Sequence, residues 1–203
     1  KLPSALPKGT CVAQVGTPEQ RALLDVIAYF ESTLVAESRG ISSYQVMVGG
    51  KPFYDLSGHP FETGEMKASV PFGSGLSSTA AGRYQFLYKI YLGLKNNNLF
   101  TAGFNALEQD KAALFAAKVS QADLENAIKT NNFIPIWDKA AVVWAGVPYS
   151  KPGNQEICDE NGLPAPQGGK YNPEKCGNGY SYFGQGGSPG HAGRRGDGHA
   201  PVG

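Results

Sequence analysis

One carboxyl group in this sequence lies in surroundings that suit acid catalysis. Glu31 follows Tyr29 and Phe30, and no Lys or Arg lies within five residues of it on either side. Apolar surroundings disfavour the charged form of a carboxyl group, so we expect the pKa of Glu31 to be raised and the group to stay protonated near neutral pH. A general acid requires such a protonated carboxyl in a cleft. The alternative is an ordinary solvated acid at the end of a helix.

A predicted helix carries Glu31 at its C-terminal end. Thr17 is suited to the N-cap, Pro18 to the first turn, and Gln20 completes a capping box. Apolar residues then recur at helical spacing, which predicts one buried face along this helix: Leu23, Leu24, Ile27 and Phe30.

The next segment predicts a small hairpin followed by a long loop. Residues 44–48 alternate in polarity, Gly49 and Gly50 supply the positive φ angles of a tight turn, and residues 51–54 return. Residues 55–78 are rich in Gly, Pro and Ser and are expected to form a loop, and loops of this length are usually functional or mobile.

Four further helical patterns follow. We expect a helix that opens in 77–85 and continues to Leu94, and others at about 105–118, 121–130 and 134–145. The last pattern carries the richest apolar stripe, so we interpret it as the central core helix.

Composition and charge bound the function classes. The chain has 203 residues, 41% of them hydrophobic and 17% charged, with a net charge of +1. This suffices for one domain with a sizeable core plus an extension. The near-zero charge gives no argument for a nucleic-acid partner, and no apolar run approaches the length of a membrane span. We also expect no cofactor and a monomer.

The domain organisation follows from shifts in composition. Residues 1–16 are interpreted as an N-terminal leader, and 17–149 as the catalytic domain. Residues 150–185 are expected to form a Cys-containing, Gly/Pro-rich insertion or extension packed on that domain, and 186–203 a flexible tail. The chain begins at Lys1 without a hydrophobic signal core, so we expect an exported product from which any signal peptide is already removed.

The cysteines support export. Cys158 and Cys176 flank a core-poor stretch that a disulfide would stabilise by about 3 kcal/mol in the chain-entropy model, and disulfides persist in oxidising compartments. Pairing of Cys11 with either of them stays open. The three histidines show no ligand spacing, so no metal site is predicted.

Four segments together resemble the endolysin family of bacteriophage lambda, within the lysozyme-like superfamily. They are AYFEST (28–33), YQVMVGG (44–50) with Phe53, DLSGHP (55–60) and STAAGRYQ (78–85), with a weaker fifth in WAGVP (144–148). The resemblance implies an α+β, mostly helical, lysozyme-like domain with a small β-hairpin lobe. Its partners would be the glycan strands of peptidoglycan.

The resemblance also implies a reaction. Members of this family cleave the β-1,4 bond between N-acetylmuramic acid and N-acetylglucosamine, and the lambda enzyme leaves a 1,6-anhydromuramyl end. Glu31 matches the catalytic glutamate, which would protonate the glycosidic oxygen and then assist attack by the muramyl 6-hydroxyl. The chemistry implied is that of a lytic transglycosylase.

For each of the other candidate site residues, we consider a role in binding substrate and an alternative role in the structure. Ser32 and Thr33 would bond Glu31 or the sugar, or merely end the helix. Gln85 would donate its amide to an N-acetyl group, or belong to a helix start. Tyr44 and Tyr84 would stack on sugars or pack in the core. Tyr182 and Gln185 are candidates in a YFGQ segment whose tyrosine is one place out of register with the family's GYGQ.

Two other functions compete. A hydrolytic muramidase needs a second carboxylate about 5–9 Å from the first, and the candidates are Glu37, Asp55, Glu62 and Glu65. A non-catalytic glycan-binding module would keep the lysozyme-like shape without the reaction. Intact Glu31 beside an intact AGRYQ segment argues against that module.

Overall fold

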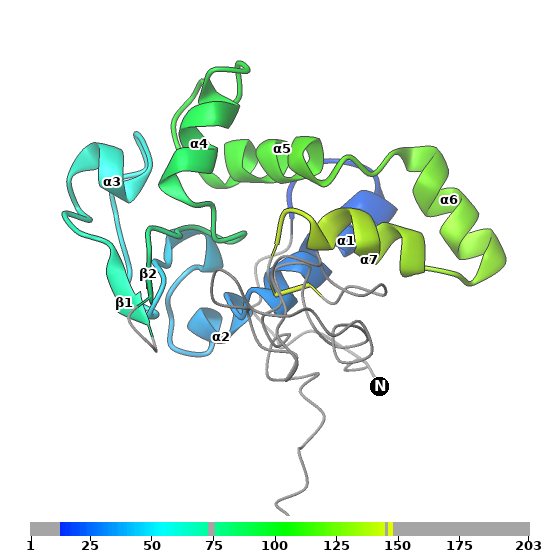
Figure 1. Cartoon of the computed structure of the whole chain (residues 1–203), viewed down its shortest axis with the longest axis horizontal. Coiled ribbons are helices and arrows are strands. Elements are labelled where there is room, and N and C mark those ends of the chain that lie inside the picture. The colour runs from blue at the N-terminus through cyan, green and yellow to red at the C-terminus, as the bar shows by residue number, and fades with distance from the viewer. Residues whose placement is uncertain (1–12, 73–75, 145, 148–203) are drawn as a thin grey trace, which may run out of the picture.

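The computed structural model describes residues 13–72, 76–144 and 146–147, and Figure 1 shows their arrangement. In chain order the elements are α1 (Pro18–Phe30), α2 (Leu34–Glu37), the 3-10 helix η1 (Ser43–Gln45), α3 (Pro60–Thr63), β1 (Val70–Phe72), β2 (Leu76–Ser78), α4 (Tyr88–Lys95), α5 (Ala106–Ala117), α6 (Gln121–Thr130) and α7 (Ile134–Ala141). The two strands and α3 lie at one end and α6 at the other, and α7 runs back from α6 toward the middle of the view. The mostly helical fold with a small antiparallel sheet was expected.

Helix α1 begins as the sequence predicts. Thr17 and Gln20 form the capping box, with the Thr17 side chain accepting from the Gln20 N–H. The apolar face is buried, and Leu24, Ile27 and Ala28 are fully enclosed in the main hydrophobic core. The helix packs against α5 and α6, so its direction is fixed by the core of the molecule.

A Schellman-type motif ends α1. The Thr33 N–H donates to the Ala28 carbonyl (3.2 Å) and the Ser32 N–H to the Tyr29 carbonyl (3.0 Å), while Ser32 takes a left-handed φ of 59°. Glycine is the usual residue at that position. The motif stops the chain from continuing along α1, which leaves Glu31 where the helix meets the following α2 segment.

The expected hairpin at 44–54 is shorter than predicted. Val46 and Pro52 form a single antiparallel bridge around Gly49 and Gly50, which have φ of 83° and 80°. Pro52 has no N–H to extend the ladder. Residues 46–48 instead pair on their other side with residues 80–82, through Val48 N–H to the Ala80 carbonyl and Gly82 N–H to the Val46 carbonyl.

The segment 55–78 is not simply a loop. It contains α3, which the His59 side chain caps by accepting from the Phe61 N–H, and the antiparallel pair β1–β2. Strands of three residues are too short for alternation to reveal them. The two-stranded sheet therefore lies about twenty residues beyond the hairpin that the sequence predicts.

The helix expected to open in 77–85 begins only at Tyr88. Gly82 and Gln85 have left-handed φ angles of 78° and 47°, and Ala81 bridges to Phe86 across the turn between them. Positive φ angles cannot continue a right-handed helix. The AGRYQ segment is therefore a tight turn, held by the 46–48 arm on one side.

The later helices largely match their predicted positions. Helices α5 and α6 agree closely, with the Ser120–Asp123 capping box at the start of α6 and Pro135 in the first turn of α7. Helix α7 ends at Ala141, four residues early, and it is not the central helix. Ile134 and Val142 at its ends are about half exposed, whereas α1 encloses Leu24, Ile27 and Ala28 completely.

Candidate active site

Glu31 lies in a cleft of about 450 Å³ between two short segments. The end of α1 and the α2 segment form one wall, from Glu31 to Arg39. Residues 46–50 form the facing wall, and Gln85 from the AGRYQ turn completes the lining. The turn after α1, the arm of the hairpin and the tight 81–86 turn thus place one carboxyl in a concave surface.

Burial determines the acidity of Glu31. Removal from water raises the pKa of its carboxyl to about 7, and the hydrogen bond from the Gly146 N–H to its Oε1 (3.1 Å) opposes this rise. The preceding Phe30 packs edge-on against Tyr29 and Trp137, so the surroundings are aromatic as the sequence indicates. A carboxyl with this pKa is substantially protonated at neutral pH.

Gly146 reaches Glu31 because it has no side chain. A Cβ at this position would lie 2.6 Å from the Phe30 carbonyl oxygen and 2.8 Å from Glu31 Oε1. Both distances are shorter than van der Waals contact, so only glycine lets the backbone N–H come so close. The segment after α7 is thereby brought to the end of α1.

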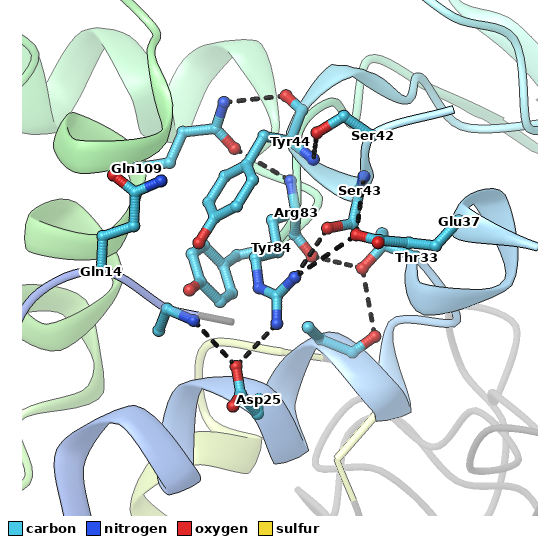
Figure 2. A network of polar contacts seen from close by, with 12 residues as sticks. Gln14, Asp25, Thr33, Glu37, Ser42, Ser43, Tyr44, Arg83, Tyr84 and Gln109 are labelled. Carbon is cyan, nitrogen blue, oxygen red and sulfur yellow. Dashed lines mark hydrogen bonds and ion pairs between the residues drawn. The ribbon is translucent and has the colours of Figure 1, made fainter. Parts of the chain in front are cut away.

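Arg83 ties together the elements around Glu31 (Figure 2). Its guanidinium is completely buried and bonds Asp25 of α1 (2.6 Å) and the Ser43 hydroxyl of η1 (2.6 Å). Glu37 of α2 lies 3.8 Å away. These are the elements that flank the cleft, so one buried cation fixes their mutual positions.

Tyr44 and Tyr84 are in the core, which corrects their expected role in sugar stacking. Their exposed fractions are 3% and 0%, and both hydroxyls donate to Asp110 Oδ1 (2.9 and 2.6 Å). Burial is the main reason why the pKa of each phenol is raised. Neither ring faces the cleft lining, so the packing alternative holds.

Thr33 also has a structural role. Its side chain is buried, and its hydroxyl donates to the Arg83 carbonyl (2.7 Å) and lies 3.1 Å from that of Ala28. It ends α1 and joins it to the AGRYQ turn, which corrects the expected contact with sugar. Ser32 is different because it is exposed, although both residues line the cleft next to Glu31.

Gln85 lines the cleft, but its amide nitrogen is engaged. It donates to the carbonyls of Gly82 (2.9 Å) and Val46 (3.3 Å), which accounts for both N–H donors. The expected donation to an N-acetyl group is therefore not what this geometry provides, nor does Gln85 start a helix. Tyr182, Gln185 and all three cysteines, including Cys158 and Cys176, lie outside the described residues.

The four candidates for a second carboxylate are bonded elsewhere. Glu37 accepts from the Ser43 N–H beside Arg83, and Glu65 accepts from the N–H groups of residues 54 and 55. Asp55 caps Ser57, and Glu62 bonds Tyr91 and Lys95. Among the described residues that line the cleft, Glu31 is the sole carboxylate.

The described chain offers neither a metal cluster nor a membrane span. No three His, Cys, Asp or Glu side chains in it come together in a way that would hold a metal ion. No helix there is both long and apolar enough to cross a bilayer.

Comparison with known proteins identifies the family. The family model described as Endolysin matches residues 21–163. The chain is 30% identical to the endolysin of Escherichia phage lambda over 145 residues, covering 68% of this chain and 82% of the relative. This chain belongs to the endolysin family. It is also 30% identical to the endolysin of Escherichia phage P2 over 140 residues, covering 66% of this chain and 82% of that relative.

The fold agrees with this assignment. The solved lysozyme from bacteriophage lambda aligns with a TM-score of 0.52 at 28% identity, covering 67% of this chain and 84% of that one. The resemblance predicted from four short segments is thus confirmed over most of the described chain. Membership of the endolysin family supports peptidoglycan degradation as the activity.

Several functional residues of this endolysin-family chain were missed by sequence reasoning. Asp25 and Asp110 are acids in apolar helical stripes, and Gln109 bonds the Arg83 N–H and the Tyr44 carbonyl. A buried arginine needs an anionic partner, so the Arg in AGRYQ was a signal that could have indicated these acids. Gly146 belongs to the WAGVP segment of the family resemblance, but its contact with Glu31 is made by the backbone N–H and is not indicated by the residue type.

Proposed function

We propose that this protein is a peptidoglycan lytic transglycosylase in which Glu31 is the single acid and base. The observation that carries the proposal is a cleft in which Glu31 is the one carboxyl group among the described lining residues, and burial raises its pKa to about 7. Such a group is available both as a proton donor and, after donation, as a base near neutral pH.

The reaction needs one carboxyl group because the substrate supplies the nucleophile. Protonated Glu31 gives its proton to the glycosidic oxygen between N-acetylmuramic acid and N-acetylglucosamine, and the bond from the muramyl anomeric carbon to that oxygen breaks. The Glu31 carboxylate then takes the proton of the muramyl 6-hydroxyl as O6 bonds the anomeric carbon. Glu31 is restored, and no water is consumed.

The distribution of the other acids favours this route over hydrolysis. A hydrolase needs a second carboxylate about 5–9 Å from the acid, as nucleophile or as base for water. Glu37, Glu62 and Glu65 bond groups away from the cleft lining, and so does Asp55. Each of them supports structure around the cleft instead.

The test compares Glu31→Gln with Glu125→Gln, which alters an exposed glutamate of α6. Glu31→Gln should remove wall-clearing activity in a turbidity assay by at least about 10²-fold, because an amide cannot deliver the proton. Glu125→Gln should clear walls like the wild type. Substantial clearing by folded Glu31→Gln contradicts the assignment, and a wild-type protein that binds but does not clear walls is a glycan-binding module.

Product analysis separates the two reactions. Mass spectrometry of the wild-type products should find 1,6-anhydromuramyl ends, which are one water lighter than reducing ends. Reducing ends alone would identify a hydrolase.

We also propose that the protein is exported with Cys158 and Cys176 joined. The proposal is supported by the core-poor composition between them, where a disulfide contributes about 3 kcal/mol in the chain-entropy model. Peptide mapping under non-reducing conditions should find the linked pair. Two free thiols in the exported protein would contradict it.

A further inference from the structure

Among the described residues, one cationic side chain lines the cleft around Glu31. Of the described residues that line it, only Glu31 and Arg39 are ionisable acids or bases, and the others are apolar, glycine or uncharged polar residues. With Glu31 protonated, the lining has a net positive charge. Such a cleft attracts an anionic group on a bound ligand.

Arg39 reaches from one wall of the cleft to the other. It follows α2, the wall that begins at Glu31, and its Nη1 lies 3.5 Å from the point where a Cβ of Gly50 would stand. Gly50 belongs to the turn of the facing wall. A ligand that lies along the cleft therefore passes beside the guanidinium.

The guanidinium of Arg39 is not used by the described fold. Its residue is exposed, and within the described part of the chain no carboxylate lies in ion-pair range of it. Arg83 shows the contrast, because its guanidinium is fully buried against Asp25 and close to Glu37. Arg39 thus has the donors for a bidentate contact and no described acceptor.

We propose that Arg39 determines specificity by binding a carboxylate carried by the muramyl residue. The sugar rings of the glycan are neutral, so its anionic groups are the lactyl carboxylate of stem-free muramyl residues and the carboxylates of the peptide stem. Arginine matches the planar, bidentate geometry of a carboxylate. This inference rests on the proposed function, since it names the substituent that the same cleft recognises.

The experiment measures KM and kcat on three forms of one peptidoglycan. The first keeps its peptide stems, the second has them removed by an amidase so that the lactyl carboxylate is free, and the third has its carboxylates capped as neutral amides with carbodiimide and ethanolamine. Arg39→Gln, Arg39→Lys and the control Lys51→Gln are compared with wild type. Lys51 is an exposed cation beside Gly50 that does not line the cleft.

Arg39→Gln should raise KM about three- to fivefold on stem-bearing peptidoglycan at low salt, the range of a solvent-accessible ion pair. Its kcat should stay within about twofold of wild type, because proton transfer is untouched. Arg39→Lys should recover part of the affinity, and Lys51→Gln should match wild type. The difference between Arg39→Gln and wild type should shrink in high salt and on the capped glycan.

The amidase-treated glycan identifies the source of the anion. The lactyl carboxyl is held in an amide where a stem is present, so a KM difference on stem-bearing peptidoglycan assigns a stem carboxylate. A KM difference on the amidase-treated glycan assigns the lactyl carboxylate. Equal KM for Arg39→Gln and wild type on both the stem-bearing and the amidase-treated glycan overturns the proposal, as does an equal loss on the capped form. Two other results would contradict the proposed function itself: a wild-type protein that does not cleave the glycan, or a Glu31→Gln variant that remains active.

Discussion

Glu31 combines two demands on one side chain, since it must be removed from water and still receive a hydrogen bond. Burial raises its pKa to about 7, from an ordinary value of 4.5, while the Gly146 N–H lowers it. In the proposed mechanism, the protonated form of Glu31 cleaves the glycosidic bond. Activity should therefore be retained below about pH 7 and fall above it.

The raised pKa makes Glu31 a source of instability at high pH. The folded state binds the Glu31 proton more tightly than the unfolded state does. The contribution of this proton to the unfolding free energy is therefore fully favourable below about pH 4.5 and is lost as pH rises through about 7. The unfolding free energy of Glu31→Gln is compared with that of wild type at two pH values. The difference should favour the variant by about 1–3 kcal/mol more at pH 8 than at pH 4.5. Urea unfolding at both pH values checks this. A difference that does not change with pH would contradict the buried acid.

Gly146→Ala should impair catalysis through Glu31. The added Cβ would stand 2.6 Å from the Phe30 carbonyl oxygen, so the segment must move and its N–H must leave Glu31. We expect a loss of about tenfold in kcat, and an alkaline limb of the pH–rate profile that moves to higher pH because a hydrogen bond that lowers the pKa is gone.

Gly93→Ala is the matched control for that substitution. Gly93 lies within α4, and a Cβ there would meet nothing within 4 Å. Alanine should raise the unfolding free energy by about 0.5–1 kcal/mol with kcat and the pH profile unchanged. If Gly146→Ala behaved like Gly93→Ala, Gly146 would have no role in positioning Glu31.

At the scale of elements, the starts of α1 and α6 could be predicted from the sequence, and the pairing of the hairpin arm could not. The capping boxes at Thr17 and Ser120 are local, since each is complete within four residues. The pairing of residues 46–48 with 80–82 joins segments more than thirty residues apart, and no local pattern records it. The left-handed φ of Gln85 interrupts an apolar periodicity that otherwise reads as helix.

The site shows the same division. Glu31 was found because its apolar neighbours are adjacent in the sequence. For Tyr44 and Tyr84 the sequence leaves sugar stacking and core packing open, because an aromatic residue gives the same local signal whether it faces a cleft or Asp110 in the core. Arg39 and Gly146 enter the site only through contacts between distant segments.

The buried Arg83 links α1 to η1 and α2, and Asp25 is its closest anionic partner (2.6 Å). Asp25 also accepts from the Ala13 N–H, so it anchors the chain before α1 (Figure 2). Asp25→Asn should lower the unfolding free energy by about 1–3 kcal/mol, because a buried cation loses its nearest counter-charge. Denaturant unfolding measures this.

Lys139→Gln is the control for Asp25→Asn. Lys139 pairs with Asp123 at a similar distance, 2.7 Å, but 41% of the lysine side chain is exposed. Removing that pair should lower the unfolding free energy by less than about 1 kcal/mol. Equal losses in the two variants would mean that burial adds nothing to the Arg83 pair.

At the scale of the whole molecule, several of the described acids stabilise the fold, and Glu31 alone among the described acids lies in the cleft. Asp25 and Glu37 lie near Arg83, Asp110 accepts from two tyrosines, and Glu62 pairs with Lys95 on the surface. Each of these acids has bonding partners that explain its place in the fold. Glu31 differs, since its one hydrogen bond comes from a backbone N–H and it lies in the cleft.

This distribution predicts the outcome of substituting each remaining candidate by its amide. Variants Glu37→Gln, Asp55→Asn, Glu62→Gln and Glu65→Gln should each lose less than about tenfold in kcat, against 10²-fold or more for Glu31→Gln. Glu37→Gln should show mainly a loss of stability, because its carboxylate lies close to buried Arg83. If one of the four abolished turnover in a folded protein and the products carried reducing ends, that carboxylate would be the second catalytic group, and the enzyme would be a hydrolase.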